Sequence, residues 1–467
     1  MPSQFSKFLL DETCQQYWHP WTQSCSNAIA GLGLHAVQES FKIYLALYTV
    51  TLLMKGKIPT REDLRKTVIS ILQSTAFLSW TGFMYAMFLC GMRRTLGHFN
   101  ILTVSFLPSF FANVLALMIE RPSRHILLCL YVSNIATETL FRMGVARGYY
   151  TAIPRGETYI FAVSITFLLY LYRSKTNMKD TICTILRFVI GEYESKEHAK
   201  NKRLHSNVPT HFTSEGQRSN AKRAHKKLQQ KDMNIVMKSF EEYKKIVKYL
   251  KTQRTQTSCL HPYSCTHYVL TGGIKLFSCG LGAQVVLDLV FQFRKIFMKP
   301  YLLKAVIFKK SNLKLGLFLG GFSALYRLVS CSLRSIFRKD SEYYAIPAGL
   351  VASTAFMAYP GNTIALYFMW KALQLLCNDF VERGIIPKVK WFMVLLYCFN
   401  TAVLFHAAIV EPLRLRPSYW TFLYRLSGGR IASISREPLE IFGLGSKRQL
   451  EIVLKKTNTT DKHLYLF

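Results

Sequence analysis

The sequence predicts an all-α fold, a polytopic helical membrane protein built from two homologous helical halves that are joined by a basic, partly disordered linker. Three observations lead to this fold class. Half of the 467 residues are hydrophobic and only 18% are charged, a composition typical of a chain with many membrane segments. Several apolar runs are long enough to span a bilayer, and segments of the first half recur in the second half.

The apolar runs extend over both halves of the chain. A spanning helix needs about 20 apolar residues, and residues 69–92, 99–119 and 391–410 form such runs without a charge. Since no run alternates as a strand does, we expect about ten helices, with Pro108 kinking the second run. The other runs are shorter or carry a charge, and re-entrant or interfacial segments are the alternative to spanning helices for several of them. They are 38–54, 126–141, 158–172, 269–293, 315–333, 344–359 and 363–376.

A strongly basic segment lies between the halves. Residues 192–254 hold sixteen Lys and Arg against seven Asp and Glu, a net charge of +9 in a chain whose total is +34. Because residues 195–231 contain few large apolar side chains, we expect a disordered linker there. Over 232–250 we expect an amphipathic helix, which either docks on its own protein or lies on lipid. Its apolar stripe consists of Val236, Phe240, Tyr243, Val247 and Leu250.

Three segments recur in the same order in both halves. They are a Cys–His-Pro–Cys group, a Tyr–Cys–Arg group at an offset of 241 residues, and the block 129–148, which shares seven identities with 365–384. We therefore expect two homologous membrane halves. The two repeats are inverted if each half crosses the membrane an odd number of times, and they are parallel if each crosses it an even number of times. The predicted division is 1–175, 176–258, 259–412 and 413–467, namely first half, linker, second half and basic tail. The Tyr–Cys–Arg groups are Tyr85, Cys90 and Arg93, and Tyr326, Cys331 and Arg334.

The recurring Cys–His groups contain side chains that Zn²⁺ accepts as ligands. Their spacing is not that of a standard zinc finger. We therefore favour packed cysteines or a redox-sensitive thiol pair over a metal site, and we expect no cofactor. The candidate ligands are Cys259, His261, Cys265 and His267 in the second half, and Cys14, His19 and Cys25 in the first.

Ionisable side chains inside apolar runs are costly unless they face protein or water. They indicate either a hydrophilic cavity, or internal ion pairs and helix ends from which the side chains reach the interface. These candidate cavity charges are Glu138, Lys275, Asp288, Arg327 and Lys371. Small residues four apart, such as Gly316 and Gly320, predict closely packed helices.

Several function classes are disfavoured. The sequence contains no phosphate-binding Gly-x4-Gly-Lys loop, no nucleophile elbow and no His-Glu-x2-His motif, so we expect a protein that is not an enzyme. Many basic residues flank apolar runs, a placement that is common in membrane proteins, where such residues lie near anionic lipid headgroups. We therefore expect no nucleic acid partner. An odd number of cysteines, eleven, and the lack of a recognisable signal peptide favour reduced thiols.

The blocks 134–148 (NIATETLFRMGVARG), 18–20 (WHP) and 415–420 (LRPSYW) resemble the transmembrane protein 135 family, also described as a peroxisomal membrane protein. The resemblance covers nearly the whole chain except the linker and the tails. It implies a multi-spanning protein of peroxisomes and mitochondria. It also implies roles in mitochondrial fission–fusion balance, peroxisome organisation and lipid metabolism.

The later half is similar to the superfamily of inner-mitochondrial-membrane translocase subunits and the small peroxisomal membrane protein. Four positions fit that superfamily's motif and three depart from it, so this similarity implies the helical architecture rather than translocase activity. The fitting residues are Ser323, Tyr326, Ala348 and Gly349, whereas Phe337, Ser341 and Ser353 stand where the motif has Arg, Asp and Gly.

We therefore expect an integral membrane protein of the peroxisome, the mitochondrion or both, with the lipid membrane as its first partner. The leading hypothesis is a non-enzymatic role in organelle organisation and lipid homeostasis. The alternative is a transporter of lipid or metabolite through a groove between the repeats, which the intramembrane charges would suit. A third hypothesis is an adaptor whose basic linker recruits organelle fission machinery.

Overall fold

The computed structural model describes residues 9–54, 59–175, 180–196, 198, 235–252, 258–299 and 301–459. Within these residues every regular element is a helix, and the only strand-like pairing is an antiparallel bridge between Leu10 and Phe99. The predicted all-α fold of a polytopic membrane protein is therefore confirmed. Residues 199–234, which make up most of the expected disordered linker, lie outside the described residues, so that expectation stays a prediction.

Contacts divide the chain into two compact units. Unit 1 comprises Met1–Ile153 and Gln374–Phe467, and unit 2 comprises Pro154–Leu373. This grouping differs from the division expected from the sequence, because residues 154–175 pack in unit 2 and residues 374–412 in unit 1. The sequence division follows the repeats and the linker, whereas the units follow the packing of the helices.

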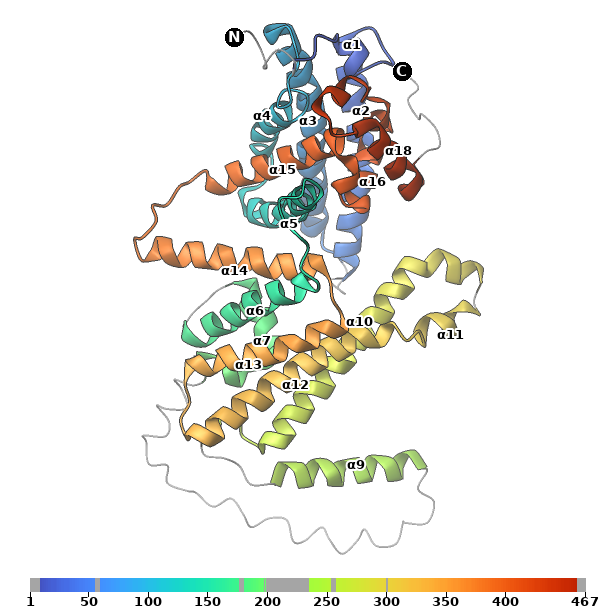
Figure 1. Ribbon diagram of the computed structural model, residues 1–467. Coiled ribbons are helices and arrows are strands. Elements are labelled where there is room, and N and C mark those ends of the chain that lie inside the picture. The colour runs from blue at the N-terminus through green and yellow to red at the C-terminus, as the bar shows by residue number, and fades with distance from the viewer. Residues whose placement is uncertain are drawn as a thin grey trace, which may run out of the picture. The chain divides into compact units, whose positions relative to one another are not determined.

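Unit 1 is built on two long helices, α2 (Cys25–Met54) and α3 (Arg61–Leu96), which lie side by side (Figure 1). A capping box starts α3, since the side chains of Thr60 and Asp63 each accept a hydrogen bond from the other's backbone N–H. The helix ends at Gly97, whose φ of 76° lies in the left-handed region that glycine adopts without strain.

The remaining helices of unit 1 cover this pair. α4 (Phe106–Leu117) packs on α3, and α15 (Phe392–Val410) packs on α4 and on α5 (Pro122–Ala146). Buried side chains such as Leu404 of α15 fill the core, and each stabilises the fold by about 1.5–3 kcal/mol relative to exposure. The other described elements are α1 (Cys14–Tyr17), α16 (Pro417–Leu426), α17 (Arg430–Ser433), α18 (Ser446–Thr457), η5 (Pro412–Arg414) and η6 (Pro438–Phe442).

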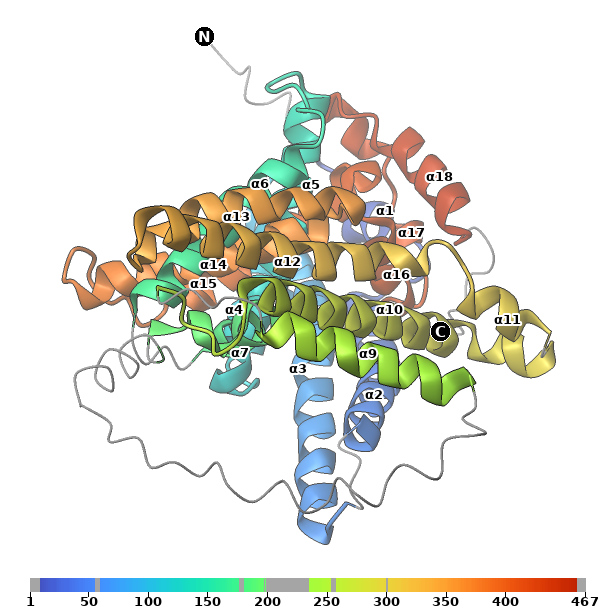
Figure 2. The same ribbon diagram turned by 90° about the horizontal axis from the view of Figure 1, so that it is seen from below.

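Unit 2 centres on the hairpin of α10 (Cys265–Met298) and α12 (Asn312–Phe337), which run alongside each other in Figures 1 and 2. A Cβ atom added to Gly280 would lie 2.9 Å from the Gly316 Cα, so glycines let the two backbones approach closely. The other described elements are α6 (Gly156–Ser174), α7 (Thr181–Ile190), η2 (Glu192–Glu194), α9 (Ile235–Thr252), α11 (Leu302–Ile307), η3 (Glu342–Tyr344), α13 (Ala345–Ser353), η4 (Thr354–Ala358) and α14 (Asn362–Glu382), whose last turns belong to unit 1.

Among the residues that the structure describes, five helical segments are long and apolar enough to cross a bilayer. They are Arg61–Leu96, Pro122–Ala146, Cys265–Val290, Leu303–Phe337 and Phe392–Val410. About ten were expected. Two of the expected runs, 99–119 and 344–359, form only the short helices α4 and α13 with η4, and α2, α6 and α14 are long but not among the five.

The expectation of a kinked spanning helix over 99–119 is wrong. Asn100 Oδ1 accepts hydrogen bonds from the backbone N–H groups of Leu102 and Thr103, at 3.0 and 2.9 Å, and so stabilises a turn before the helix. Pro108 then lies in the first turn of α4, where proline is tolerated. The 12 residues of α4 span about 18 Å, less than the ~30 Å hydrocarbon core.

The amphipathic helix expected over 232–250 corresponds to α9, which contacts α10 (Figure 2). Of the expected apolar stripe, Val247 and Leu250 are half-buried, whereas the side chains of Val236, Phe240 and Tyr243 lie outside the described set. Ile246 and Tyr249 are exposed. The contact with α10 favours the docked interpretation for the C-terminal part of the helix.

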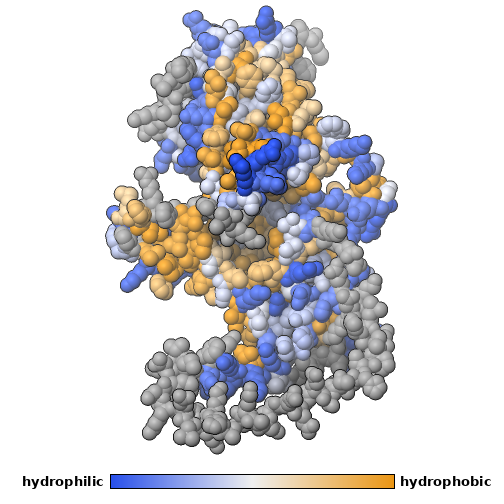
Figure 3. Space-filling view, turned by 180° about the vertical axis from the view of Figure 1, so that it is seen from behind, coloured by the Kyte–Doolittle hydropathy of each residue, from blue (hydrophilic) through white to orange (hydrophobic). Residues whose placement is uncertain are grey.

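Large apolar side chains also remain exposed on the long helices. Figure 3 shows hydrophobic residues, in orange, gathered in broad areas of the face in view. Leu45, Leu47 and Val50 of α2 and Val286 and Val290 of α10 are between 44% and 66% exposed. Extended apolar surface is typical of contact with lipid or with another protein, so these helices suit a membrane-embedded chain.

The internal duplication stays a prediction, although two local features agree with it. The aligned blocks 129–148 and 365–384 both end helices at a left-handed glycine, Gly148 (φ 77°) and Gly384 (φ 73°). The same backbone hydrogen bond closes both helix ends. The Gly148 N–H donates to the Val145 carbonyl oxygen and the Gly384 N–H donates to that of Val381, each at 3.1 Å. The second feature is the pair of Cys/His clusters described next.

Candidate functional site

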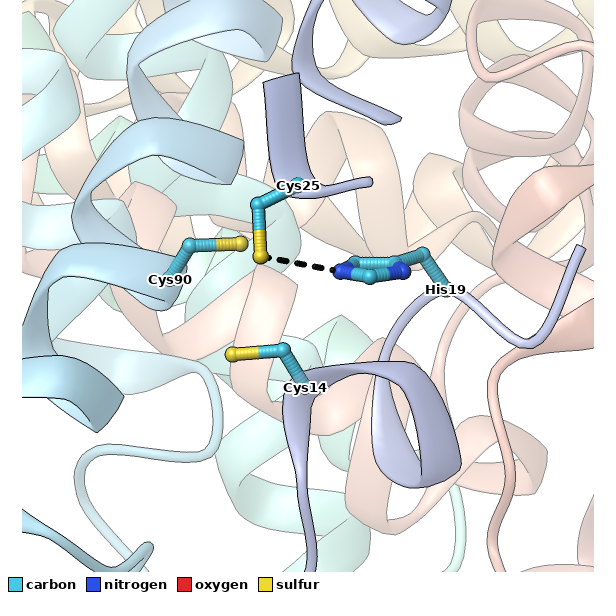
Figure 4. Close-up of side chains that lie close together, drawn as sticks. All are labelled: Cys14, His19, Cys25 and Cys90. Atoms are coloured by element: carbon cyan, nitrogen blue, oxygen red, sulfur yellow. Dashed lines mark hydrogen bonds between the residues drawn. The ribbon is translucent and has the colours of Figure 1, made fainter. Parts of the chain in front are cut away.

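Two clusters, each of three cysteines and one histidine, form in the described residues, one in each unit. The N-terminal Cys/His cluster consists of Cys14, His19, Cys25 and Cys90 (Figure 4). Cys14 opens α1, His19 follows that helix, Cys25 opens α2, and Cys90 lies near the end of α3. The His19 Nε2 lies 3.3 Å from the Cys25 Sγ, and all four potential ligand atoms lie within 4.8 Å of one another.

The central Cys/His cluster consists of Cys259, His261, Cys265 and Cys331. Cys265 opens α10 as Cys25 opens α2, and Cys331 lies toward the end of α12 as Cys90 does in α3. The Sγ atoms of Cys259 and Cys265 are 3.5 Å apart, and the Cys331 Sγ lies 3.4 Å from the His261 Nε2. The two clusters thus occupy matching places on two helical hairpins.

Both histidine rings are held by the same kind of hydrogen bond, from Nδ1 to a backbone carbonyl oxygen. The Nδ1 of His19 lies 2.8 Å from the Thr22 carbonyl oxygen, and the Nδ1 of His261 lies 2.5 Å from that of Tyr263. A carbonyl oxygen only accepts, so each Nδ1 carries a proton and donates it. The Nε2 is therefore the ring nitrogen that faces the thiols, Cys25 in one cluster and Cys331 in the other.

Three of the four ligands expected in the second half come together, and the fourth does not. The His267 Nε2 lies 3.4 Å from the Thr271 Oγ1, outside the cluster, and Cys331 takes the fourth place. Cys14, His19 and Cys25 also converge, joined by Cys90. Ligand spacing within a short segment cannot reveal Cys90 and Cys331, but the recurrence of the two at an offset of 241 residues could have found them.

The clusters change the acid–base properties of their members. Hydrogen bonding from Cys90 lowers the pKa of the Cys14 thiol to about 7, against the opposing effect of burial. Burial lowers the pKa of His261, but hydrogen bonding to Cys259 and Cys265 outweighs burial and raises that pKa to about 9. Both effects favour a cysteine thiolate, the form that reacts with disulfides and binds soft metals.

A cavity of about 570 Å³ lies beside the central Cys/His cluster, within unit 2. Arg187, Lys275 and Arg327 line it together with a single carboxylate among its described lining, that of Glu192. Its volume is that of an ordinary small-molecule pocket, and its excess of cationic groups suits an anionic ligand.

The five candidate cavity charges do not form one site. Lys275 and Arg327 line the cavity, where Arg327 donates to the carbonyl oxygens of Ile190 and Tyr268 at 3.2 and 3.0 Å. The other three have local partners. Lys371 pairs with Asp180 at 2.9 Å, Glu138 pairs with Arg142 and Arg416, and Asp288 accepts a hydrogen bond from Gln284 at 3.4 Å.

Sequence reasoning missed a buried ionic network in unit 2. Glu194 lies in the basic linker expected over 176–258, yet it is buried and pairs with Arg173 and Arg334. Asp340 pairs with the same two arginines. The only signal in the sequence was the Arg of the recurring Tyr–Cys–Arg group, which is Arg334.

Comparison with known proteins concerns mainly unit 1. No solved structure matches the chain. Residues 12–145 match the sequence model of a family described as the N-terminal cysteine-rich region of Transmembrane protein 135. The match contains the whole N-terminal Cys/His cluster and α3, one of the helices long and apolar enough to cross a bilayer. With its apolar helices the chain is a membrane protein, and over residues 12–145 it is similar to the N-terminal cysteine-rich region of Transmembrane protein 135.

Proposed function

We propose that this chain is a non-enzymatic, integral protein of the peroxisomal membrane, the mitochondrial membrane or both. There it acts in mitochondrial organisation (the balance of fission and fusion), in peroxisome organisation and in lipid homeostasis. The observation that supports this most is the family match over residues 12–145. Its partners are the lipid membrane and organelle fission machinery.

Imaging in cells tests the location. The full chain, tagged at its C-terminus and expressed at native level, should overlap with peroxisomal or mitochondrial markers and resist extraction with carbonate. A plasma-membrane or nuclear pattern would contradict the proposal.

Removal and restoration of the chain test the role. Cells that lack the chain should show altered mitochondrial length, peroxisome distribution and stored neutral lipid, and the wild-type chain should restore them. A matched variant, Ala408→Arg, places a charge at a fully buried position of α15 and should restore none of them. Unchanged mitochondria, peroxisomes and lipid stores after removal would refute the role.

The cavity of unit 2 supports a second candidate function, transport of an anionic lipid or metabolite. Lys275 lines the cavity and its side chain is exposed, with the Nζ 5.4 Å from the centre of the Phe188 ring. An exposed cation beside an aromatic ring can bind an anionic headgroup while the ring contacts its apolar part.

Flux across reconstituted vesicles distinguishes transport from a purely organisational role. Lys275→Gln should reduce flux of fatty-acid or phospholipid probes several-fold. Asp288→Asn is the matched control, because Asp288 also lies in α10 but does not line the cavity. Equal flux for wild type, Lys275→Gln and empty vesicles would remove the transporter hypothesis.

A further inference from the structure

We propose that the two Cys/His clusters are structural zinc sites, each binding one Zn²⁺ through three cysteine thiolates and one histidine imidazole. This inference is independent of the proposed function, since it rests on side-chain geometry within each unit. Three observations support it: the spacing of the ligand atoms, the orientation of the histidines, and the repetition of the arrangement.

The spacing of the ligand atoms fits a single tetrahedral ion. Zinc binds sulfur at about 2.3 Å and nitrogen at about 2.0–2.1 Å, which puts the ligands of one tetrahedral ion about 3.5–3.8 Å apart. The contacts His19–Cys25, Cys259–Cys265 and His261–Cys331 measure 3.3, 3.5 and 3.4 Å. All the ligand atoms of a cluster lie within 4.8 Å of one another, so a small movement suffices to centre an ion.

The histidines are prepared for coordination through Nε2. In metalloproteins the ligating imidazole almost always donates its other N–H to a carbonyl or carboxylate, which fixes the tautomer and the ring. Thr22 and Tyr263 supply such carbonyls to His19 and His261. Stacking of the His261 ring on Tyr268, with centroids 4.5 Å apart, restrains that ring further.

The ligand set argues for a structural role and for zinc. Three thiolates and one imidazole complete a tetrahedron and leave no position for water or substrate, as in structural zinc sites. A two-iron cluster would need ligands spread around two metal ions, wider than the clusters here. Binding releases the protons of the thiols, so it is favoured at neutral pH and above.

Each ion would tie three segments together. In the N-terminal Cys/His cluster, Cys14 and His19 belong to the segment before α2, Cys25 to the start of α2, and Cys90 to α3. The central cluster joins the segment before α10 to α10 and α12 in the same way. The zinc ions would thus fasten the same end of each hairpin to the segment that precedes it.

Metal analysis of the purified full chain tests the proposal. The chain is purified in detergent through a tag without histidines, and its metals are measured by mass spectrometry against protein concentration. We expect two zinc ions per chain, one for each cluster. Replacement by Co²⁺ should produce the visible absorption of a tetrahedral thiolate site.

Variants assign the ions to the clusters. Cys90→Ala and Cys331→Ala should each halve the zinc content, and the double variant should lose it. The control His267→Ala should retain both ions, because the His267 side chain lies outside the cluster although it follows Cys265 by only two residues. Cys279→Ala, at an exposed cysteine of α10, should also retain both. Loss of zinc in either control would overturn the assignment.

Two further outcomes would overturn the proposal. One is a wild-type chain without stoichiometric zinc, whether it holds iron with the absorption of an iron–sulfur cluster, copper, or no metal. The other is a disulfide between Cys259 and Cys265, which would resist alkylation after chelation and yield only to a reductant. For a zinc site, chelation alone should make all the cluster thiols reactive.

Discussion

Arg334 and Glu194 lie 140 residues apart in the chain, yet their side chains form a two-pronged ion pair without exposure to solvent. The Arg334 NH1 and NH2 groups donate to the two carboxylate oxygens of Glu194 at 2.9 and 2.6 Å. Arg173 donates to the same carboxylate at 2.7 Å. It also donates to Asp340, whose negative charge offsets the positive charge of the second arginine. The network thus joins α6, α12 and the start of the basic segment inside unit 2.

We predict that Glu194→Gln destabilises unit 2 by about 3–5 kcal/mol. Removal of one partner leaves buried arginine charge without its full compensation, which costs far more than the loss of a surface pair. The measurement is the unfolding midpoint of the detergent-solubilised chain. Glu242→Gln is the control, since Glu242 and its partner Lys245 are 64% and 69% exposed and should contribute less than about 1 kcal/mol. Equal midpoints for the two variants would contradict the prediction.

Stability should also depend on the protonation of Glu194. Burial raises the pKa of this carboxyl, but Arg334 and Arg173 outweigh burial and lower the pKa from 4.5 to about 2. A carboxyl with a lowered pKa stabilises the folded state fully above its unfolded pKa, and the contribution is lost as the pH falls toward the folded pKa. The unfolding midpoint should therefore drop more between pH 5 and pH 3 in the wild type than in Glu194→Gln. Parallel pH profiles would refute this.

The sequence was sufficient for the class of fold, because long apolar runs without alternation have only one spanning form. The bounds of the helices and of the two units were harder to predict from the sequence. Whether 99–119 forms one long helix depends on local turns such as the one that the Asn100 side chain stabilises, and mean hydropathy does not describe such turns. The grouping of residues 154–175 with unit 2 depends on tertiary packing, for which the local pattern contains no signal.

For the candidate site, the sequence located the residues that are close in the chain. Cys259, His261 and Cys265 share one segment, so their proximity follows from chain connectivity. Cys331 reaches them only because α12 packs against α10, and the burial of Glu194 likewise depends on α6 and α12. Distant partners of this kind become visible only once the helices are placed in space.

Close packing of the α10–α12 hairpin leads to a prediction that compares two glycines of one helix. A Cβ on Gly280 would meet the Gly316 Cα and the Leu315 carbonyl oxygen, both at 2.9 Å, whereas a Cβ on Gly282 would meet nothing within 4 Å. Gly280→Ala should therefore separate the helices and destabilise the chain by about 1–3 kcal/mol. Gly282→Ala should be neutral or stabilising by up to about 1 kcal/mol, because alanine favours helix.

Thermal unfolding of both glycine variants, together with the yield of monodisperse protein, measures the effect. The comparison is internal, since both changes add one methyl group to the same helix two residues apart. If Gly282→Ala proves as damaging as Gly280→Ala, helix flexibility rather than close approach explains the role of these glycines.

The last prediction concerns α9 and lipid. Lys244, Lys245 and Lys248 are exposed on this helix, as are the apolar side chains of Ile246 and Tyr249. Near an anionic leaflet each lysine contributes up to about 1 kcal/mol, screened beyond a Debye length of about 8 Å at physiological salt. A peptide of residues 235–252 should therefore gain helicity on anionic vesicles, measured by circular dichroism, and lose it as salt rises. Replacing the three lysines by glutamine should abolish the gain. If the wild-type peptide shows no change with anionic vesicles at low salt, α9 serves only as a helix docked on α10.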